Sequence, residues 1–317
     1  MNDLRIVFMG TPEFAVGILD TLIQEGYTVV GVITVADKPA GRGQQLHYSP
    51  VKKYALEKGL PLLQPTNLKD PQFIQELAAL EANVQVVVAF RMLPEVVWRM
   101  PKWGTFNLHA SLLPNYRGAA PINWALMNGE KETGVTTFFI DDQIDTGAMI
   151  LSKATPIEPN ENAGHLHDRL LNLGCKAVVE TLELIAAGTV ATTIQNDTPD
   201  IKTAYKLNKD NCKVDFSKTG LEIYNQIRGL SPYPAAWCIV NDQGNEWNIK
   251  LYETEWEPLQ HSLSIGTWLA SKKEIKIAVK GGFLRILRLQ FPGKKQMTAT
   301  EVVNGMKFSE NCKAYSN

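Results

Sequence analysis

Residues 104–147 read GTFNLHASLLPNYRGAAPINWALMNGEKETGVTTFFIDDQIDTG, and this stretch sets the interpretation of the chain. An apolar run at 105–109 predicts a strand whose pleat sends the side chains of Asn107 and His109 to one face. Asp145 follows a second apolar run, in an Asp-Thr-Gly turn 38 positions after Asn107. An amide can donate to a developing oxyanion, a histidine can carry a proton near neutral pH, and an aspartate can orient it. The stretch therefore predicts a group transfer without a metal or a protein nucleophile.

Strand and helix signals alternate through the first half of the chain. Four apolar runs predict strands that are buried on both faces of a sheet, at residues 4–9, 29–34, 84–89 and 105–109. A Thr, Ser or Asp followed by proline predicts a capped helix start at Thr11, Ser49 and Asp70. Repeated β-α units of this kind predict a doubly wound, mostly parallel α/β sheet. Ligands bind at the carboxyl ends of such strands, where His109 falls.

The sequence pattern changes after Gly188. Residues 162–188 have the apolar spacing of one long helix, which Gly188 would end. Short apolar runs separated by Asn-rich and Gly-rich turns follow and predict a small β-barrel. We therefore expect a catalytic domain over residues 1–189, a linker over 190–208 and a smaller C-terminal β-barrel domain over 209–317.

Composition places the chain among ordinary globular proteins. The 317 residues are 44% hydrophobic and 21% charged, which fits two domains. An Asp precedes any apolar run at the N-terminus, and no apolar run approaches the ~20 residues that span a bilayer. We therefore expect neither a secretory signal nor a membrane segment. The four cysteines lack C-x-x-C spacing, which favours reduced thiols in the cytoplasm over disulfides or a zinc site.

Charge is distributed unevenly between the two expected domains. The formal net charge is −1, but residues 209–317 hold 15 Lys and Arg against 11 Asp and Glu. The residues before them hold 17 Lys and Arg against 22 Asp and Glu. A mildly basic C-terminal domain on an acidic partner domain is consistent with the docking of a polyanion such as a nucleic acid.

Several motifs resemble those of a known family. NLHASLLPNYRGAAP at 107–121, followed by DTG at 145–147, resembles the signature of enzymes that use 10-formyltetrahydrofolate as formyl donor. MGTPEFA at 9–15, ADKPAGRGQQL at 36–46 and SPYPAAW at 231–237 are similar to the methionyl-tRNA formyltransferase family. The similarity covers essentially the whole chain and implies a Rossmann-like formyltransferase domain with an OB-like C-terminal barrel. It also implies transfer of a formyl group to the α-amino group of methionyl initiator tRNA in the cytoplasm, for translation initiation.

The resemblance implies roles for individual residues. Asn107 and His109 would stabilise the oxyanion and relay the proton, while Asp145 would orient His109 and help to deprotonate the amine. Lys38 and Arg42, in a basic loop, would contact the charged initiator tRNA. The folate would be held by two segments, whose residues are Val88, Ala89, Phe90, Ser111, Leu112, Leu113 and Pro114. No metal, membrane or obligate protein partner is implied.

This chain departs from the family at one point. Arg91 follows Phe90 where the family commonly has a glycine. A glycine at such a place often marks a positive φ, which arginine adopts poorly. We therefore expect the loop after Phe90 to have a backbone shape that differs from the family's.

Two other functions remain open on the residues alone. A formyltransferase that acts on a sugar amine or a ribonucleotide amine would share the chemistry of Asn107, His109 and Asp145 but not the basic loop. A catalytically silent RNA-binding module would not need these three residues. The turn at residues 10–12 lacks the G-x-G-x-x-G spacing, which argues against a nicotinamide cofactor.

Overall fold

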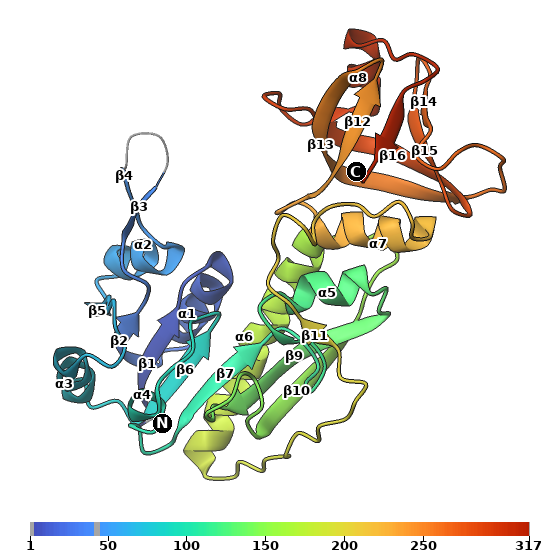
Figure 1. Ribbon diagram of the computed structural model, residues 1–317. Coiled ribbons are helices and arrows are strands. Elements are labelled where there is room, and N and C mark those ends of the chain that lie inside the picture. Colours follow the sequence, from blue (N-terminus) through green and yellow to red (C-terminus); the bar gives the residue numbers. More distant parts are fainter. Residues whose placement is uncertain (1–2, 41–44, 317) are drawn as a thin grey trace. The chain divides into compact units, whose positions relative to one another are not determined.

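The computed structural model describes residues 3–40 and 45–316 of the chain (Figure 1). The chain divides into two compact units. The first holds Met1–Gly118, Thr133–Thr155 and His167–Thr203, and the second holds Ala119–Glu132, Pro156–Leu166 and Ala204–Asn317. The second unit thus takes two segments from the half of the chain that was expected to form the catalytic domain alone, and the predicted boundaries at 189 and 208 stay a prediction. Within the described ranges, no helix has the length and apolar character that crossing a membrane requires.

A seven-stranded sheet forms the centre of the first unit. Its strands are β1 (Arg5–Gly10), β2 (Thr28–Ile33), β5 (Leu62–Leu63), β6 (Val84–Val88), β7 (Thr105–His109), β9 (Glu132–Phe139) and β10 (Met149–Pro156). The strand order is β10-β9-β7-β6-β1-β2-β5, in which the strands from β7 to β5 run parallel and β9 runs antiparallel to β7. The expected doubly wound, mostly parallel sheet is confirmed. A separate two-stranded sheet pairs β8 (Arg117–Gly118) with β11 (Thr203–Ala204).

Helices cover both faces of the seven-stranded sheet. They are α1 (Glu13–Gln24), α2 (Pro50–Glu57), α3 (Pro71–Ala79), α4 (Glu95–Trp98) and α6 (Ala163–Ala187). α6 packs on one face, because a Cβ atom added to Gly174 would come within 2.8 Å of Leu108 on β7. α3 and α4 pack on the other face, in a core cluster with Val87. Since Val87 is the register partner of Asn107, the side chain of Asn107 faces the α3 and α4 side and that of Leu108 faces α6.

The helix ends follow local sequence signals, with one exception. Ser49 and Asp70 each accept a hydrogen bond from a backbone N–H in the first turn of their helices, at 3.0 and 2.9 Å, as predicted. Gly188 follows α6 with a φ of 65°, which confirms it as the end of the long helix. The prediction for Thr11 is wrong. The helix begins one residue later, with Pro12 as an N-cap that makes no side-chain hydrogen bond.

The basic loop contains a short hairpin. β3 (Lys38–Ala40) pairs antiparallel with β4 (Gln45–His47). Arg42 lies outside the described residues, and only the backbone of Lys38 is described. The tRNA contacts expected of Lys38 and Arg42 therefore stay a prediction.

The base of this hairpin is tied to α2. Asp37 accepts hydrogen bonds from Nζ of Lys52 and from Nε2 of Gln64. The hydrogen bond from Lys52 is the main reason why the pKa of Asp37 lies below its ordinary value. The hairpin thus leaves the first unit from an ordered base.

The first part of the predicted linker packs against the first unit. Thr193 pairs with the start of β10. The backbone N–H of Lys202 donates to Oδ1 of Asn115 at 3.0 Å. Gln195, between these two points, is 8% exposed. Residues 190–203 are therefore part of a folded unit, although their sequence has no periodicity.

The second unit joins three helices, among its described residues, to an antiparallel sheet. Its elements are α5 (Pro121–Met127), α7 (Gly220–Leu230), β12 (Ala236–Asp242), β13 (Asn245–Pro258), β14 (Trp268–Ala270), β15 (Ile275–Val279), β16 (Gly282–Gln290), β17 (Met297–Thr298), α8 (Ala299–Gly305) and β18 (Lys313–Tyr315). The sheet has the order β14-β15-β16-β13-β12-β18, and a bridge between Thr267 and Lys313 links its two edges. The nearly closed barrel that results confirms the expected C-terminal fold. Trp268, 2% exposed, is the largest side chain in its core.

Gly134 on β9 occupies a point where a side chain does not fit. A Cβ atom there would lie 2.1 Å from the carbonyl oxygen of Lys153 and 2.6 Å from the side chain of Leu112. We expect Gly134→Ala to lower the free energy of unfolding by about 1–3 kcal/mol, because the backbone must shift. Gly305→Ala is the matched control, since nothing lies within 4 Å of its added Cβ atom. Urea denaturation measures both variants, and equal stabilities would contradict the close approach at β9.

Candidate active site

Two of the predicted catalytic residues meet in the first unit, and the third is close along the strand. The Nδ1 atom of His109 lies 3.8 Å from Oδ2 of Asp145, and both side chains are largely buried. The loop between β9 and β10 carries Asp145 to this place. Asn107 stands two positions before His109 on the same face of β7. The three residues that the sequence singled out therefore lie near one another in the first unit.

A backbone carbonyl fixes where the proton sits on the His109 ring. Nε2 of His109 lies 2.7 Å from the carbonyl oxygen of Tyr116. A carbonyl oxygen can only accept a hydrogen bond, so Nε2 carries the proton and the neutral ring presents the lone pair of Nδ1 to Asp145. The 3.8 Å gap is too long for a direct hydrogen bond. Two acceptors therefore face one another, which suits a substrate N–H group or a water molecule between them.

The turn that carries Asp145 has an unusual backbone. Asp145 has a φ of 56°, in the left-handed region that Asp and Asn tolerate better than most residues. Its Oδ2 atom accepts a hydrogen bond of 2.8 Å from the backbone N–H of Gly118. Gly147 is required in the turn, since a Cβ atom there would lie 1.7 Å from the carbonyl oxygen of Phe139. Backbone geometry thus explains the glycine of the Asp-Thr-Gly motif.

The amide of Asn107 has an unsatisfied end. Its Oδ1 atom is buried and has no hydrogen-bond partner among the residues that the structure describes. An unpaired buried acceptor costs about 1–3 kcal/mol, which a substrate N–H group would offset. The other end of the same amide is the donor that the predicted oxyanion role requires. Asn107 can therefore serve an amine and a carbonyl oxygen together.

The predicted folate segment after β7 is held by Thr136 on β9. Oγ1 of Thr136 donates to the carbonyl oxygen of Ser111 at 2.8 Å and accepts from the N–H of Leu113 at 3.2 Å. Ser111 is fully buried, so it can reach a ligand only through its backbone, and Leu113 is 7% exposed. Leu112 and Pro114 are partly exposed. They are the side chains of this segment that are available for contact.

The predicted folate segment after β6 also contains both buried and exposed side chains. Val88 is fully buried, and its side chain points to the α6 face, away from Asn107. Ala89 is exposed with a φ of 48°, and Phe90 is partly buried. The left-handed residue of this loop is thus Ala89, two positions before Arg91. Val88 can contribute only backbone atoms, whereas Ala89 is exposed and Phe90 is partly exposed at the edge of a core cluster.

Arg91 has a structural contact that a glycine could not make. Its guanidinium donates to the carbonyl oxygen of Thr66 at 2.9 Å and to that of Pro65. Burial lowers the pKa of Arg91. Its Nε atom is buried without a hydrogen-bond partner in the described part of the chain. Arg91 therefore fastens the loop at 65–66 to the carboxyl end of β6.

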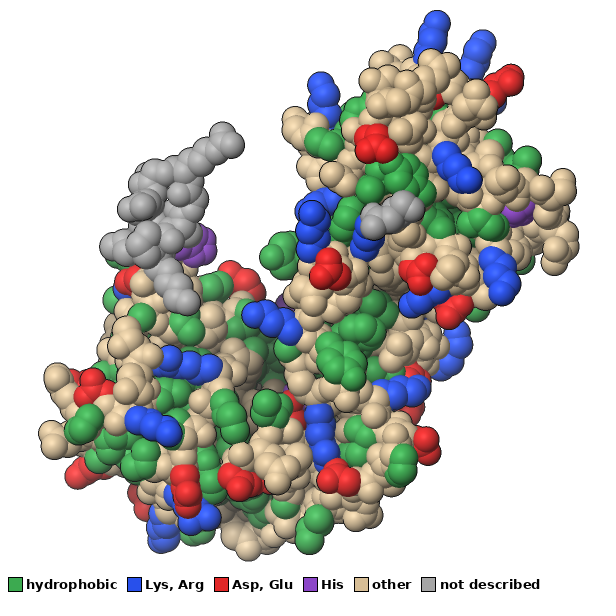
Figure 2. All heavy atoms as spheres, in the orientation of Figure 1, with side chains coloured by type: hydrophobic (Ala, Val, Ile, Leu, Met, Phe, Trp, Pro, Cys, Tyr) green, Lys and Arg blue, Asp and Glu red, His purple; other side chains and the backbone are tan. Residues whose placement is uncertain are grey.

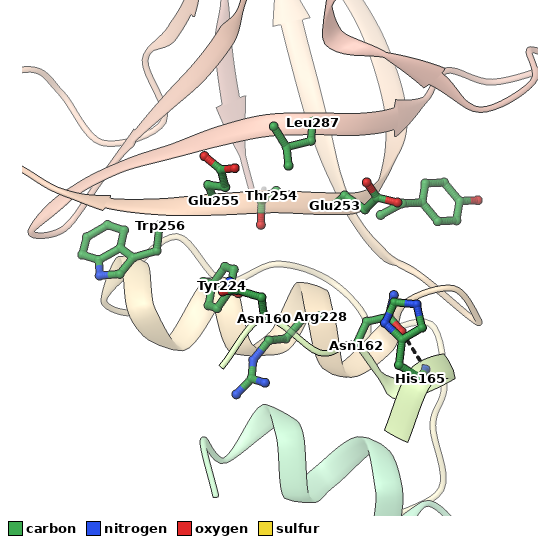
Figure 3. A pocket seen from close by; sticks show the side chains of 11 residues that line it. Asn160, Asn162, His165, Tyr224, Arg228, Glu253, Thr254, Glu255, Trp256 and Leu287 are labelled. Atoms are coloured by element: carbon green, nitrogen blue, oxygen red, sulfur yellow. Dashed lines mark hydrogen bonds between the residues drawn. The ribbon is translucent and has the colours of Figure 1, made fainter. Parts of the chain in front are cut away.

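A cavity in the second unit has a different character. It measures about 640 Å³ and lies between α7 and β13 (Figure 3). Its lining residues are Asn160, Asn162, His165, Tyr224, Arg228, Tyr252, Glu253, Thr254, Glu255, Trp256 and Leu287. Cavities of this size often mark binding sites. None of the three predicted catalytic residues belongs to it, so we do not assign the reaction to this cavity.

The second unit also carries a cationic aromatic cluster. The ammonium groups of Lys209 and Lys213 lie 5.2 and 5.0 Å from the ring centre of Trp237. Such a ring can stack with a nucleic-acid base while the lysines approach phosphates. On the face seen in Figure 2, Lys and Arg side chains are interspersed with Asp and Glu rather than gathered in one patch. The basic excess of the C-terminal residues is therefore dispersed on this face.

Sequence reasoning missed three residues around the predicted site. Tyr116 and Gly118 act through backbone atoms, which no residue type reveals. Gln195 lies in the predicted linker, where the sequence has no periodicity to mark a buried residue. The contacts of Gln195 to the Asp145 turn could be found only in three dimensions.

Comparison with known proteins agrees with a formyl-transfer site. A family model described as formyl transferase matches residues 4–182, and one described as formyl transferase, C-terminal domain matches residues 206–307. A methionyl-tRNA formyltransferase from Flavobacterium johnsoniae is 66% identical, over 99% of this chain and 100% of the relative. One from Bacteroides thetaiotaomicron is 52% identical, over 98% of each chain.

Solved structures share the fold at much lower identity. The sugar 3N-formyl transferase WlaRD, crystallised in the presence of dTDP and 5-N-formyl-THF, has a TM-score of 0.64 at 20% identity and covers 93% of this chain and 100% of its own. HypX from Aquifex aeolicus in complex with tetrahydrofolic acid has a TM-score of 0.63 at 17% identity. That match covers 95% of this chain and 47% of HypX. At these identities the likeness concerns the fold alone.

The contacts of Arg91 generate a prediction about stability. Arg91→Met keeps the length of the side chain but removes its donors to the loop at 65–66. We expect the free energy of unfolding to fall by about 1.5–3 kcal/mol, the range for hydrogen bonds to charged groups. The control is Arg99→Met, because Arg99 forms an exposed ion pair with Glu95 that is worth only about 0.3–0.5 kcal/mol. Equal losses in urea denaturation would show that Arg91 does not anchor the loop.

Proposed function

The chain belongs to the methionyl-tRNA formyltransferase family, and on that premise we propose that Asn107, His109 and Asp145 catalyse its formyl transfer. The reaction moves a formyl group from a folate-derived donor to the α-amino group of methionine on initiator tRNA, giving N-formylmethionyl-tRNA. The observation that supports this site is the pair of acceptors that face one another across 3.8 Å, Nδ1 of His109 and Oδ2 of Asp145.

His109 is assigned the proton transfer. The amine attacks in its neutral form, and it must lose one of its two protons as its nitrogen bonds to the formyl carbon. Nδ1 of His109 accepts this proton as the amine nitrogen bonds to the formyl carbon. The Tyr116 carbonyl remains bonded to Nε2, and the carboxylate of Asp145 stabilises the imidazolium. His109 then gives the proton to the folate nitrogen, whose bond to the formyl carbon breaks, so the ring returns to its neutral form.

Asn107 is assigned the formyl oxygen. Its amide N–H donates to this oxygen as negative charge develops, a type of contact worth on the order of 10²–10³ in rate. The buried and unpaired Oδ1 atom of the same side chain accepts an N–H of the incoming amine. One side chain thereby orients both reacting groups, which lowers the entropic cost of bringing them together.

The folate-derived donor is assigned as 10-formyltetrahydrofolate. Two structural relatives bear on this assignment, WlaRD with 5-N-formyl-THF and HypX with tetrahydrofolic acid. Four side chains at the carboxyl ends of β6 and β7 are at least partly exposed and suit an apolar ring system, namely Ala89, Phe90, Leu112 and Pro114. Val88 and Ser111 are fully buried and contribute through their backbone atoms, and Leu113 is 7% exposed.

The tRNA is assigned to the basic loop and the C-terminal domain. Lys38 and Arg42 in the hairpin approach the acceptor end, near the amino acid. The C-terminal domain, over residues 209–317 with a linker at 190–208, holds the rest of the tRNA, and the Trp237 cluster is its best-supported contact. The use of the product in translation assigns the enzyme to the cytoplasm.

A sugar-amine or ribonucleotide-amine substrate is the rival assignment. The same catalytic residues would serve it, and one structural relative is a sugar 3N-formyl transferase at 20% identity. The relatives at 66% and 52% identity over the full chain favour the tRNA substrate. The deciding experiment compares formyl transfer to charged initiator tRNA, to a charged elongator tRNA and to an amino sugar nucleotide. Transfer to the amino sugar with none to tRNA would overturn the assignment.

The roles of the three catalytic residues predict large losses of activity. Asn107→Ala and His109→Ala should each reduce kcat/KM about 10²–10³-fold with little change in unfolding free energy, because they act on the transition state. Asp145→Ala should be comparably inactive and should change the pH–rate profile. Near wild-type turnover in Asn107→Ala or His109→Ala would remove the assigned mechanism. An unchanged pH profile in Asp145→Ala would reduce Asp145 to a turn residue.

The basic loop predicts a loss that is specific to tRNA. Arg42→Ala should cost about 1.5–3 kcal/mol, a ten- to hundredfold fall in kcat/KM for charged tRNA, if Arg42 makes a charge-assisted contact. The KM for the folate donor should hardly change. Arg42→Lys should restore activity only in part, because lysine lacks the forked geometry. Higher salt should narrow the gap between wild type and Arg42→Ala. Equal kcat/KM of wild type and Arg42→Ala at low salt would show that Arg42 does not contact the tRNA.

A further inference from the structure

Gln195 is buried beside the turn that carries Asp145. Its Nε2 atom donates to the carbonyl oxygen of Asp145 at 2.9 Å and to that of Gly147 at 2.8 Å. The first of these carbonyls belongs to Asp145, the left-handed residue of the turn, and the second lies two residues later. A left-handed conformation costs roughly 1–2 kcal/mol for a residue with a side chain. One amide group therefore braces both ends of a turn that is unfavourable by itself.

The opposite end of the Gln195 amide binds Arg117. Nε and Nη2 of Arg117 donate to Oε1 of Gln195 at 3.1 and 2.9 Å. The two backbone neighbours of Arg117 touch the catalytic side chains, because the Tyr116 carbonyl holds His109 and the Gly118 N–H holds Asp145. The contacts thus form a closed ring that runs from His109 through residues 116–118 to Gln195, and on to Asp145.

Gln195 uses both ends of its amide in this ring. The two backbone carbonyls need donors, and the guanidinium of Arg117 needs an acceptor. A carboxylate would keep the contact with Arg117 but could not donate to the carbonyls. An apolar side chain would leave the two carbonyls without this donor, and Arg117 would keep only its ion pair with Asp197 at 2.7 Å. The arrangement selects an amide at a position that has no periodic signal in the sequence.

We infer that Gln195 is a positioning residue that holds the carboxylate of Asp145 against His109. The inference rests on the proposed roles of these two residues. The segment after α6 is then part of the active site as well as a connection to the second unit. Gln195 touches no reacting atom and acts only through the turn and through Arg117. The titratable and charged groups around Asp145 that share this arrangement are His109, Arg117 with its ion-pair partner Asp197, and, through Thr146, Asp141.

The test uses Gln195→Ala and Gln195→Glu in the full chain. Misplacement of a catalytic group by about 1 Å can cost on the order of a hundredfold in rate. We expect kcat to fall about tenfold to a hundredfold in both variants, with little change in the KM for either substrate. We expect the pH–rate profile to move in the same way as in Asp145→Asn. The side chain of Gln195→Glu has nearly the size of the natural one, so a fall in kcat in this variant would come from the missing N–H donors.

Gln226 on α7 provides the matched control. It is also 8% exposed, and its Nε2 atom also donates to two backbone carbonyls, those of Asn211 at 3.2 Å and Lys213 at 2.9 Å. Gln226→Ala should lower the unfolding free energy as much as Gln195→Ala but leave kcat and the pH profile unchanged. If Gln195→Ala behaves like Gln226→Ala while Asp145→Asn is inactive, Gln195 has only a structural role. If Asp145→Asn keeps full activity, the proposed catalytic site itself is wrong.

Discussion

The hydrogen bond between Nε2 of His109 and the carbonyl of Tyr116 is the constraint on which the rest of the site depends. Because a carbonyl cannot donate, this bond places the proton of the neutral ring on Nε2 and leaves Nδ1 as an acceptor. The ring then faces the carboxylate of Asp145 with a lone pair rather than with an N–H group. Such a pair of acceptors binds an amine as a donor and can take its proton, which is the task that formyl transfer sets.

The sheet makes this site possible by separating two kinds of side chain on one strand. Leu108 faces the helix α6 and closes the core, whereas Asn107 shares the opposite face with Val87. Thr136 on β9 holds the following segment by one hydroxyl that both donates and accepts. The glycines at 134 and 147 allow neighbouring backbones to approach where any side chain would collide. Side-chain hydrogen bonds thus hold the segments around the site to neighbouring parts of the first unit.

The same fold serves different amines. A sugar 3N-formyl transferase shares it at 20% identity, so the fold and the formyl chemistry do not choose the substrate. The choice must come from parts that contact the amine's carrier rather than the amine. In this chain we propose the basic loop at 36–46 and the Trp237 cluster as such parts, and the relatives at 66% and 52% identity support a tRNA as the carrier. Arg91 has no part in this choice of substrate. It stands where the family commonly has a glycine, and its contacts anchor the loop at 65–66.

The sequence alone determined the fold class, because buried parallel strands and capped helices leave periodic signals in residue type. It also predicted the catalytic set of Asn107, His109 and Asp145, which lie within residues 104–147. It did not determine the start of α1, because a proline preceded by Thr fits two adjacent positions of a helix start. It did not reveal Gln195, because that residue lies 50 positions from the turn that it braces and belongs to no repeating pattern. Only the tertiary structure decided which backbone atoms hold the catalytic side chains, since every residue carries the same carbonyl and N–H groups and only folding brings particular ones together.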